Sequence, residues 1–322
     1  MHSGVTRSLP MLSVIIVSYN TQEMTLDCLR TLERELKEIP SEIYVIDNAS
    51  EDGSVDAVRR EFPQVHVVTS EKNLGFGSAN NLGMARTSGD AILLLNSDAF
   101  PRPGAISALL KYLDCHPEVG VVGPRLLNRD GSLQLSCFKF PSPARCWLEN
   151  LWLSALFQNS ARLGDYRRWP HDSERIVDFV SGACLLARRA VYDQVGGFDE
   201  MFFMYSEETD WQRRITDHGW KIAFTPEAEV VHLAGASGAA EPARISKHFF
   251  NSLDYYEWKH HGVLGLIALR AAMIAGSLMR LVLWLLAMLA PNKRHAAKSK
   301  ARLHAWLLWR QSTKWRLTLP NR

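Results

Sequence analysis

The feature that most constrains the fold of this chain is an apolar run, residues 91–95, that leads directly into Asn96, Ser97 and Asp98. A short run of Ala, Ile and Leu bounded by polar residues predicts a buried strand of a parallel sheet. In open α/β sheets, ligands bind at the carboxyl ends of the strands. A carboxylate held there suits a divalent cation that bridges the phosphates of a nucleotide. An N-cap for the next helix explains the same three residues, so this segment alone leaves both interpretations open.

Three earlier apolar runs have the same form, because each leads into polar or glycine-rich residues. They are residues 12–20, 43–50 and 65–68, the last followed by the loop 72–83. Helices are predicted between them, near residues 21–38, 54–61 and 77–87. The pattern continues with a helix over 104–114, a strand over 119–124 and a β-hairpin over 126–137. Alternating strands and helices of this length predict right-handed crossovers and a doubly wound, mostly parallel α/β sheet.

Charge is distributed unevenly along the chain, although the formal net charge is only +3. There is no Asp or Glu after Glu257, and there are 12 Lys or Arg from Lys259 onward. The first 258 residues hold 25 basic and 34 acidic side chains, a net charge of −9, so the remainder carries +12. The two parts of the chain are therefore expected to meet different partners.

The C-terminal part is predicted to be helical from residue 245 and to associate with a membrane. Residues 263–290 are long enough to span a bilayer, but Arg270 and Arg280 lie about 80° apart on that helix and make a span costly. Tryptophans then alternate with Lys and Arg, a composition that suits an anionic membrane surface. Nucleic acid suits the same composition, but nothing in the first half of the chain indicates that bases are read. No nucleic-acid partner is therefore expected.

A second apolar segment, residues 147–157, contains Trp147 and Trp152. It predicts a short helix that is either buried on the flank of the domain or dips towards lipid. The expected organisation is a disordered lead over residues 1–10, an α/β domain over 11–255 and a basic, Trp-rich helical tail over 256–322.

The five cysteines form no Cys-x-x-Cys pair, so neither a zinc site nor a disulfide framework is expected. No apolar segment typical of a signal peptide precedes the first strand. Both observations favour the reducing cytoplasm.

Several motifs, taken in order, resemble the family 2 glycosyltransferases with the GT-A fold. They are residues 17–20 (Val-Ser-Tyr-Asn), 46–54 (Ile-Asp-Asn-Ala-Ser-Glu-Asp-Gly-Ser), 73–80 (Asn-Leu-Gly-Phe-Gly-Ser-Ala-Asn), 95–98 (Leu-Asn-Ser-Asp), 180–189, 196–200, 203–210 and 232–237. The resemblance covers about residues 11–255 and is strongest to the rhamnosyltransferase branch, which elongates lipid-linked bacterial surface glycans. It implies a GT-A fold and transfer of a sugar from a nucleotide diphosphate.

The resemblance assigns the donor to residues at the strand ends and in the glycine-rich loop. They are Tyr19, Asn20, Asp47, Asn73, Gly75, Gly77, Asn80, Ser97 and Asp98. Asp47 suits the imide edge of a pyrimidine base, although a helix-capping Asp explains the same position. The glycines let the backbone approach a phosphate or ribose, since they carry no Cβ.

The metal ligands implied by the resemblance are Asp98 and His232, which would hold Mn2+ or Mg2+ at the donor diphosphate. The full Asp-x-Asp form is absent, because Asn96 stands at its first position. This departure predicts a weaker or more water-rich site. An imidazole ligand suits Mn2+ better than Mg2+.

The general base implied by the resemblance is the second member of an acidic pair, which here is Glu208. The family pair is usually Glu-Asp, whereas this chain has Glu207 and Glu208. Because the second carboxyl reaches one methylene further, either glutamate remains a candidate. Two charges in the first turn of a helix are also favourable without catalysis. Gly182, Ala183 and Tyr205 are expected on the acceptor side, and Asp210 and Arg214 are expected to brace the helix.

The expected activity is inverting, metal-dependent glycosyl transfer, with L-rhamnose from dTDP-rhamnose as the first candidate donor. The acceptor would be a hydroxyl of a lipid-linked or polysaccharide substrate, at the cytoplasmic face of the bacterial inner membrane. Association of the C-terminal helices into a homo-oligomer is a further expectation. Alternatives are a UDP- or GDP-sugar donor and a non-catalytic membrane-bound sugar-nucleotide sensor. A sugar-1-phosphate nucleotidyltransferase needs a glycine-rich turn with Arg and Lys near the N-terminus, which Val17-Ser18-Tyr19-Asn20 does not supply.

Overall fold

The computed structural model describes residues 11–157, 166, 169–233, 242–290, 292 and 294–313, with only the backbone for Ala155 and for residues 242–247. The expected lead over 1–10 and the end of the last motif, residues 234–237, lie outside the described residues. Contacts divide the chain into two compact units. Unit 1 combines Met1–Lys139 with Trp169–His248, and unit 2 combines Phe140–Arg168 with Phe249–Arg322.

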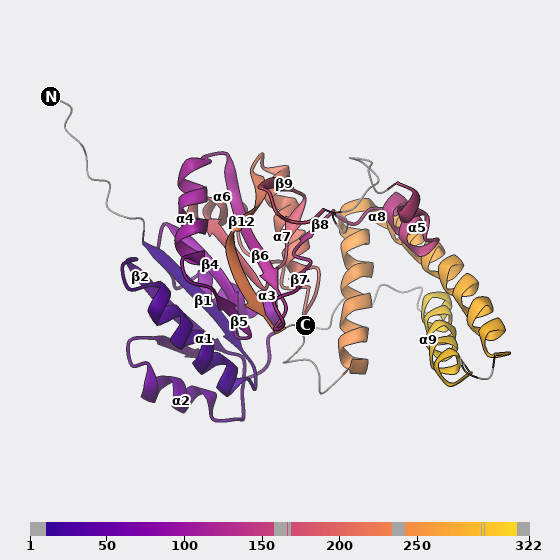
Figure 1. Cartoon of the computed structure of the whole chain (residues 1–322), viewed down its shortest axis with the longest axis horizontal. Coiled ribbons are helices and arrows are strands. Elements are labelled where there is room, and N and C mark those ends of the chain that lie inside the picture. The colour runs from indigo at the N-terminus through magenta and orange to yellow at the C-terminus, as the bar shows by residue number, and fades with distance from the viewer. Residues whose placement is uncertain are drawn as a thin grey trace. The chain divides into compact units, whose positions relative to one another are not determined.

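Unit 1 is built on a mostly parallel sheet, as the apolar runs predict (Figure 1). Its longest path has the order β3-β2-β1-β4-β11-β6-β12-β5, in which β11 and β5 run antiparallel to their neighbours. The strands of the chain are β1 (Leu12–Ser18), β2 (Ser41–Asp47), β3 (His66–Thr69), β4 (Ala91–Asn96), β5 (Ala99–Pro101), β6 (Val119–Leu127), β7 (Leu133–Gln134), β8 (Cys137–Phe138), β9 (Arg175–Val177), β10 (Phe179–Val180), β11 (Cys184–Arg188) and β12 (Lys221–His232).

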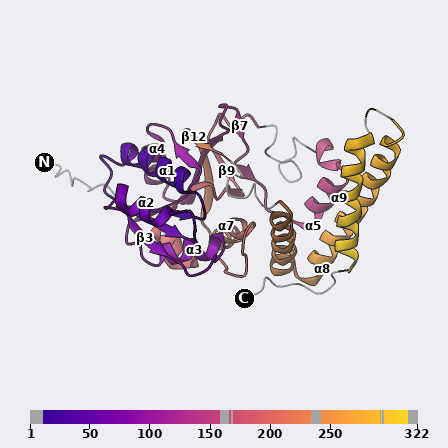
Figure 2. The same ribbon diagram turned by 90° about the horizontal axis from the view of Figure 1, so that it is seen from below.

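Helices cover both faces of this sheet, which explains why β1 and β4 are continuous apolar runs. The helices of unit 1 are α1 (Gln22–Glu35), α2 (Ser54–Glu61), α3 (Phe76–Met84), α4 (Ala105–Cys115), α6 (Arg189–Val195) and α7 (Glu207–Asp217). Val14 and Ile16 pack into a core with α1, α2 and α4, whereas Ile15 points to α3 on the opposite face. Figure 2 shows α1 and α4 on one side of the sheet and α3 and α7 on the other.

The predicted hairpin after residue 126 is present. Strand β7 pairs antiparallel with the end of β6, so that Leu126 lies opposite Gln134. The turn between them closes with the amide of Asn128 donating to the carbonyl of Ser132, and Gly131 has a positive φ of 83°. This hairpin brings Gln134 to the end of β12, and it matters for the site described below.

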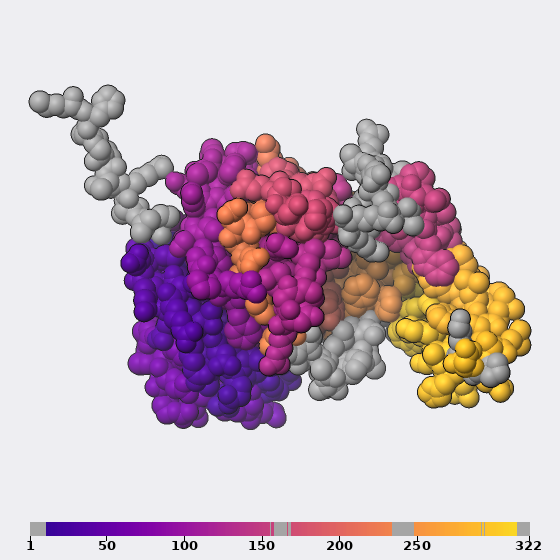
Figure 3. All heavy atoms as spheres, viewed as in Figure 1, coloured from indigo at the N-terminus to yellow at the C-terminus, as the bar shows by residue number. Residues whose placement is uncertain are grey.

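Unit 2 is helical. It contains α5 (Pro143–Asn150), a short 3-10 helix (Leu153–Leu156), most of α8 (Pro242–Ala287) and α9 (Arg294–Thr313). Helix α8 is two helices joined at Gly262, whose φ of 68° is readily adopted only by glycine. Leu307 of α9 packs on Leu269 of α8, and Cys146 of α5 joins the same small core. Figure 3 shows residues 143–157 against the C-terminal helices.

The segment 147–157 therefore belongs with the C-terminal helices, whereas the sequence analysis included it in the α/β domain. Neither of its expected positions describes it fully. Cys146 is buried in the core of unit 2, but Trp152 is 52% exposed and Leu156 74% exposed.

The two arginines that interrupt the apolar part of α8 both contact other residues of unit 2, and Arg270 is buried. Arg270 is 3% exposed and its guanidinium lies 3.1 Å from the carboxylate of Asp254. Arg280 lies 4.8 Å from the ring centre of Trp152 and donates to the carbonyl of Glu149. By length and composition, the segment His248–Ala287 is able to cross a membrane, although the core helix of a soluble protein passes the same criterion.

Candidate functional site

The loops at the carboxyl ends of the strands contain most of the unusual backbone geometry. Among the described residues, six that are not glycine have a positive φ, and four of these are predicted site residues or lie within two residues of one. They are Asn20, Ala49, Tyr205 and Ser206. Such conformations typically cost about 1–3 kcal/mol each and concentrate at functional sites. This edge of the sheet is therefore the candidate site.

Asp98 and His232 lie together at this edge, as expected. The Oδ1 atom of Asp98 is 3.3 Å from Nε2 of His232. The proximity follows from strand pairing, because β5 begins one residue after Asp98 and Ala99 lies opposite His232 in β12. The amide of Leu233 also donates to the carbonyl of Asp98, at 3.0 Å. Asn96, at the first position of the motif, directs its Nδ2 to the same His232 nitrogen at 3.4 Å.

The donor set of this pair fits a divalent cation. A carboxylate oxygen and an imidazole nitrogen are ligands that Mn2+ accepts. No group of three or more His, Cys, Asp or Glu side chains with metal-binding geometry occurs in the described part of the chain. Further ligands would then have to come from the diphosphate of a donor and from water, as in other sites where a metal bridges protein and phosphate.

Asp47 has one carboxylate oxygen in use and one available. Its side chain is 3% exposed, and Oδ2 accepts a hydrogen bond from the amide of Ser50 at 3.1 Å. Oδ1 is buried and has no hydrogen-bond partner among the described residues. At the start of α2, the amide of Ser54 donates to the carboxylate of Asp52 and not to that of Asp47. The helix-capping alternative for Asp47 is therefore not what the structure shows.

Tyr19 and Asn20 follow the end of β1, and Asn20 contacts the loop after β2. The Asn20 amide donates to Ser50 Oγ at 3.0 Å, and its side-chain oxygen accepts from the amide of Glu51 at 2.8 Å. Ser97, directly after the end of β4, shares a hydrogen bond of 3.0 Å with Thr21. These contacts tie the ends of β1, β2 and β4 together.

Asn48, which the sequence analysis did not single out, orders the glycine-rich loop. Its Nδ2 donates to Asn73 Oδ1 at 3.0 Å and to the carbonyl of Gly75, while its Oδ1 accepts from the amide of Leu74. The signal available in the sequence was its position directly after Asp47 at a strand end.

The glycines of this loop have a packing role that the sequence analysis did not foresee. Gly75 has a φ of 83°, and a Cβ there would collide with the carbonyl of Phe203. A Cβ on Gly77 would lie 3.4 Å from Cβ of Glu207. Asn80 is buried within α3 and donates to the carbonyl of Phe76. These residues bring α3 close to the acidic pair, and their expected contacts with a donor remain predictions.

Glu207 and Glu208 open α7, as predicted, and their environments differ. Glu207 is 4% exposed and faces α3, whereas Glu208 is more open and faces Gly182. Burial raises the pKa of Glu207 well above its ordinary value, and the charge of Glu208 raises it further. Burial also raises the pKa of Glu208, against backbone hydrogen bonds that lower it. The Oε2 atom of each is buried without a hydrogen-bond partner among the described residues.

The acceptor-side residues lie beside this pair. A Cβ on Gly182 would be 3.4 Å from Cβ of Glu208. Burial, then the charges of Glu207 and Glu208, raise the pKa of Tyr205. The carbonyl of Ala183 accepts from the amide of Asn96 at 2.9 Å. The segment 182–183 thus connects the acidic pair to the strand that carries the Asp98 motif.

Asp210 and Arg214 brace α7, as expected. Their side chains form an ion pair of 2.9 Å in which Asp210 is fully buried. Arg214 also donates to the carbonyls of Val195 and Gly197. This anchoring holds the start of α7, and with it both glutamates, in one position.

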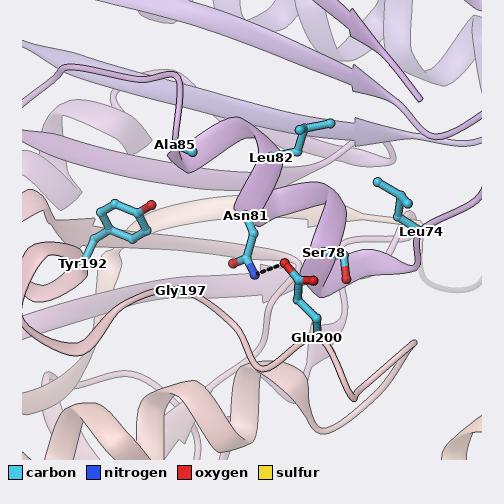
Figure 4. A pocket seen from close by; sticks show the side chains of 8 residues that line it. All are labelled: Leu74, Ser78, Asn81, Leu82, Ala85, Tyr192, Gly197 and Glu200. Atoms are coloured by element: carbon cyan, nitrogen blue, oxygen red, sulfur yellow. Dashed lines mark hydrogen bonds between the residues drawn. The ribbon is translucent and has the colours of Figure 1, made fainter. Parts of the chain in front are cut away.

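A separate hollow lies on the outer side of α3 (Figure 4). Ser78, Asn81, Tyr192 and Glu200 contribute to its lining, and Asn81 donates to Glu200 at 3.3 Å. None of the predicted site residues lines it. The candidate site is therefore the strand-end cluster rather than this hollow.

The sequence and the fold of the chain are similar to those of known proteins. Residues 13–196 match the family described as Glycosyl transferase family 2. The chain is 32% identical to the N-acetylglucosaminyl-diphospho-decaprenol L-rhamnosyltransferase of Mycobacterium tuberculosis, over 76% of this chain and 86% of that protein. It is 25% identical to the dTDP-rhamnosyl transferase RfbF of Shigella flexneri, over 69% of this chain and 68% of that protein.

A solved structure of similar fold is a mannosyltransferase from Pyrobaculum calidifontis, in complex with GDP-Man and Mn2+. The TM-score is 0.54 at 17% identity, over 96% of this chain and 89% of that one. This likeness concerns the fold, and it agrees with the GT-A fold that the sequence motifs implied.

Proposed function

The chain belongs to glycosyl transferase family 2 and is a glycosyltransferase, and from this premise we propose that it transfers L-rhamnose from dTDP-rhamnose with inversion. The acceptor in this proposal is a hydroxyl of a lipid-linked glycan of the bacterial cell surface. The observation that carries the choice of sugar is the 32% identity to an N-acetylglucosaminyl-diphospho-decaprenol L-rhamnosyltransferase. The similarity to a dTDP-rhamnosyl transferase supports the same donor.

In the proposed donor complex, Asp47 accepts a hydrogen bond from the imide N–H of thymine. Its buried Oδ1, which has no hydrogen-bond partner in the described part of the chain, supports this role, because a buried carboxylate oxygen is costly to leave unsatisfied. Asn48 keeps the neighbouring loop in place through its contacts with residues 73–75. Tyr19 and Asn20 complete the frame around the nucleotide.

Asp98 and His232 are the proposed ligands of the metal at the donor diphosphate. Their separation of 3.3 Å and their ligand types support Mn2+, which also accompanies GDP-Man in the mannosyltransferase of similar fold. When bound, a divalent ion supplies Lewis-acid neutralisation of the departing diphosphate. Asn96 carries no charge. The proposed protein ligands therefore supply a single negative charge, that of Asp98.

Glu208 is the proposed general base. As the acceptor oxygen attacks the anomeric carbon, the bond from that carbon to the diphosphate oxygen breaks, and the electron pair leaves with the nucleoside diphosphate. The hydroxyl proton passes to Glu208. Glu208 suits this role better than Glu207, because it is the more open of the two and faces Gly182. The deeper Glu207 keeps its proton to higher pH, since its charge would be both buried and next to Glu208.

Unit 2 is the proposed contact with the cytoplasmic face of the inner membrane. Arg270 is buried and Arg280 is half-buried against Trp152, so that every largely exposed residue between 263 and 289 is Val, Leu or Ile. They are Val263, Leu264, Ile267, Leu278, Val282, Leu283, Leu285, Leu286 and Leu289. Helix α9 adds exposed Arg294, Lys298, Lys300 and Arg302, followed by exposed Trp306 and Trp309. Apolar and basic residues together favour an anionic bilayer.

The donor is tested by incubating the purified chain with dTDP-rhamnose and with UDP- and GDP-sugars, and by measuring release of the nucleoside diphosphate. The expected result is fastest release from dTDP-rhamnose, dependent on Mn2+ and abolished by a chelator. Faster release from a UDP- or GDP-sugar would overturn the donor assignment, and full activity in chelator would overturn the metal assignment.

The membrane surface is tested by sedimentation with anionic and neutral lipid vesicles. Replacing Lys298 and Lys300 with Gln should weaken binding to anionic vesicles by up to about 30-fold, because each basic residue contributes about 1 kcal/mol. Leu285→Gln with Leu286→Gln should weaken binding to both kinds of vesicle. Ile176→Gln, an exposed apolar residue of unit 1, is the control and should change neither. Unchanged binding in both double variants would instead favour self-association through this surface, which sedimentation without lipid would reveal.

A further inference from the structure

We propose that Gln134 is a positioning residue that selects the tautomer of His232, so that Nε2 presents a lone pair next to Asp98. The inference rests on the proposed metal site, but it concerns residues of the β6–β7 hairpin that no motif of the sequence identified. The Oε1 atom of Gln134 lies 2.7 Å from Nδ1 of His232. The direction of this hydrogen bond follows from the groups around it.

Two backbone carbonyls fix the orientation of the amides, because a carbonyl only accepts. The Nδ2 atom of Asn128 donates to the carbonyl of Leu133 and to Ser132 Oγ, which leaves Asn128 Oδ1 as the acceptor on its other side. Gln134 Nε2 donates to that Oδ1 at 2.9 Å and to the carbonyl of His232 at 3.2 Å. Gln134 must therefore turn its oxygen, Oε1, to the imidazole. An oxygen at 2.7 Å requires that Nδ1 carry the hydrogen.

Asp98 favours the opposite tautomer. A neutral His232 with its hydrogen on Nε2 would donate to Asp98 Oδ1 at 3.3 Å. Its Nε2 would then have no lone pair for a cation, and its Nδ1 lone pair would face the oxygen of Gln134. Gln134 makes that state unfavourable. In the tautomer that it selects, Nε2 and the Asp98 carboxylate both offer lone pairs, and the Nδ2 group of Asn96 is an N–H donor within 3.4 Å.

This arrangement has the general form of metal sites in which a ligating histidine donates its other N–H to a fixed acceptor. In such sites the loss of the acceptor typically lowers metal affinity by about 10- to 100-fold. The fixed acceptor here is a neutral amide. The hairpin holds it, because Gln134 pairs with Leu126 in the sheet.

The test uses the full chain and two readouts, neither of which needs turnover. The tautomer of His232 is read by nitrogen NMR on histidine-labelled protein without metal, and Mn2+ affinity is read by electron paramagnetic resonance with dTDP present. Gln134→Leu should shift His232 towards the Nε2–H tautomer and weaken Mn2+ binding by about 10- to 100-fold. Gln134→Glu keeps an acceptor at Nδ1 but loses the donor to Asn128 and to the carbonyl of His232, so it should keep the hydrogen on Nδ1 and bind Mn2+ more tightly than Gln134→Leu.

Asp130→Ala is the control for damage to the hairpin, because it removes turn contacts to Ser132 without removing a contact of Asn128 or Gln134, and it should leave His232 unchanged. Wild-type Mn2+ affinity in Gln134→Leu, or an unchanged tautomer there, would overturn the inference. If Gln134→Leu does not fold, loss of the Nδ1–H tautomer or of Mn2+ binding in Gln134→Glu would overturn it as well. Mn2+ binding that is equal in wild type and Asp98→Ala would instead reject the metal site itself, whatever the tautomer.

Discussion

Replacing Asp254 with Asn tests how unit 2 keeps charge away from its apolar surface. Asp254 is paired with Arg270 at 3.1 Å and with Arg310 at 3.4 Å. The arginine side chains are each 3% exposed and the carboxylate is 8% exposed, so water screens none of them well. The cluster carries two positive charges and one negative charge. Asp254→Asn keeps the shape of the side chain but leaves both guanidiniums without a counter-charge.

Removing one partner from a buried ion pair usually costs about 3–5 kcal/mol, because the remaining charge stays buried. Asp254→Asn raises the net charge of the cluster from +1 to +2, so the full cost is expected. Arg270→Met lowers the same net charge to zero and retains the pair of Asp254 with Arg310. Its cost should be only about 0–1 kcal/mol, since the remaining pair of Asp254 and Arg310 leaves no buried charge without a counter-charge.

The assay is urea unfolding followed by tryptophan fluorescence, with the free energy of unfolding compared among the variants. Arg30→Met is a surface control, because Arg30 pairs with Asp27 and Glu61 while 44% exposed. It should cost less than about 1 kcal/mol. The reasoning would be refuted if Asp254→Asn were as stable as the wild type, or if Arg270→Met were the more damaging change.

Three other outcomes are expected. Asp98→Ala should abolish Mn2+-dependent transfer while the circular dichroism spectrum is retained, and undiminished turnover would reject Asp98 as a ligand. Gly75→Ala should lower the free energy of unfolding by about 1–3 kcal/mol, because its φ is positive and a Cβ would meet the Phe203 carbonyl; a neutral effect would show that the loop relaxes. In the pH profile of kcat/KM, the midpoint of the acid limb should lie above pH 4.5, the ordinary pKa of a glutamate. Burial raises the pKa of Glu208, and only the ionised form of Glu208 accepts a proton. A limb at or below pH 4.5 would contradict that assignment.

The strands and the position of the site were predictable because both depend on local pattern. An apolar run such as residues 91–95 becomes a strand covered on both faces, and parallel strands bring their carboxyl ends to one edge. Asp47 ends β2 and Asp98 lies two residues after the end of β4, so they were expected at that edge. The pairing of Asp98 with His232 followed from the family resemblance, and the register of β5 with β12 explains it.

The contacts that were not predicted join segments distant in the sequence. Nothing local indicates that Cys146 packs with Leu269, or that Arg270 finds Asp254 rather than lipid. A helical wheel gives the angle between Arg270 and Arg280, but it does not tell which neighbour each one meets. Gln134 was overlooked for the same reason, since it is 98 residues from His232 and belongs to a two-residue strand.

The packing of residues 143–157 with the C-terminal helices also changes how the tail should be studied. Truncation after about residue 258 would remove Leu269 and Leu307, against which Cys146 packs. Loss of activity in such a truncation would then report on an exposed core as well as on membrane contact. Substitutions on the surface of α8 and α9 separate the two effects.

The central claim is that this glycosyltransferase uses Glu208 to deprotonate its acceptor, and one measurement tests it most directly. Turnover of dTDP-rhamnose with a short soluble acceptor is compared for the wild type, Glu208→Gln and Glu207→Gln, with donor affinity measured separately. Glu208→Gln should lower kcat by about 100- to 10,000-fold with donor affinity nearly unchanged, and Glu207→Gln should lose far less. A larger loss in Glu207→Gln, or near-normal turnover in Glu208→Gln, would contradict the account.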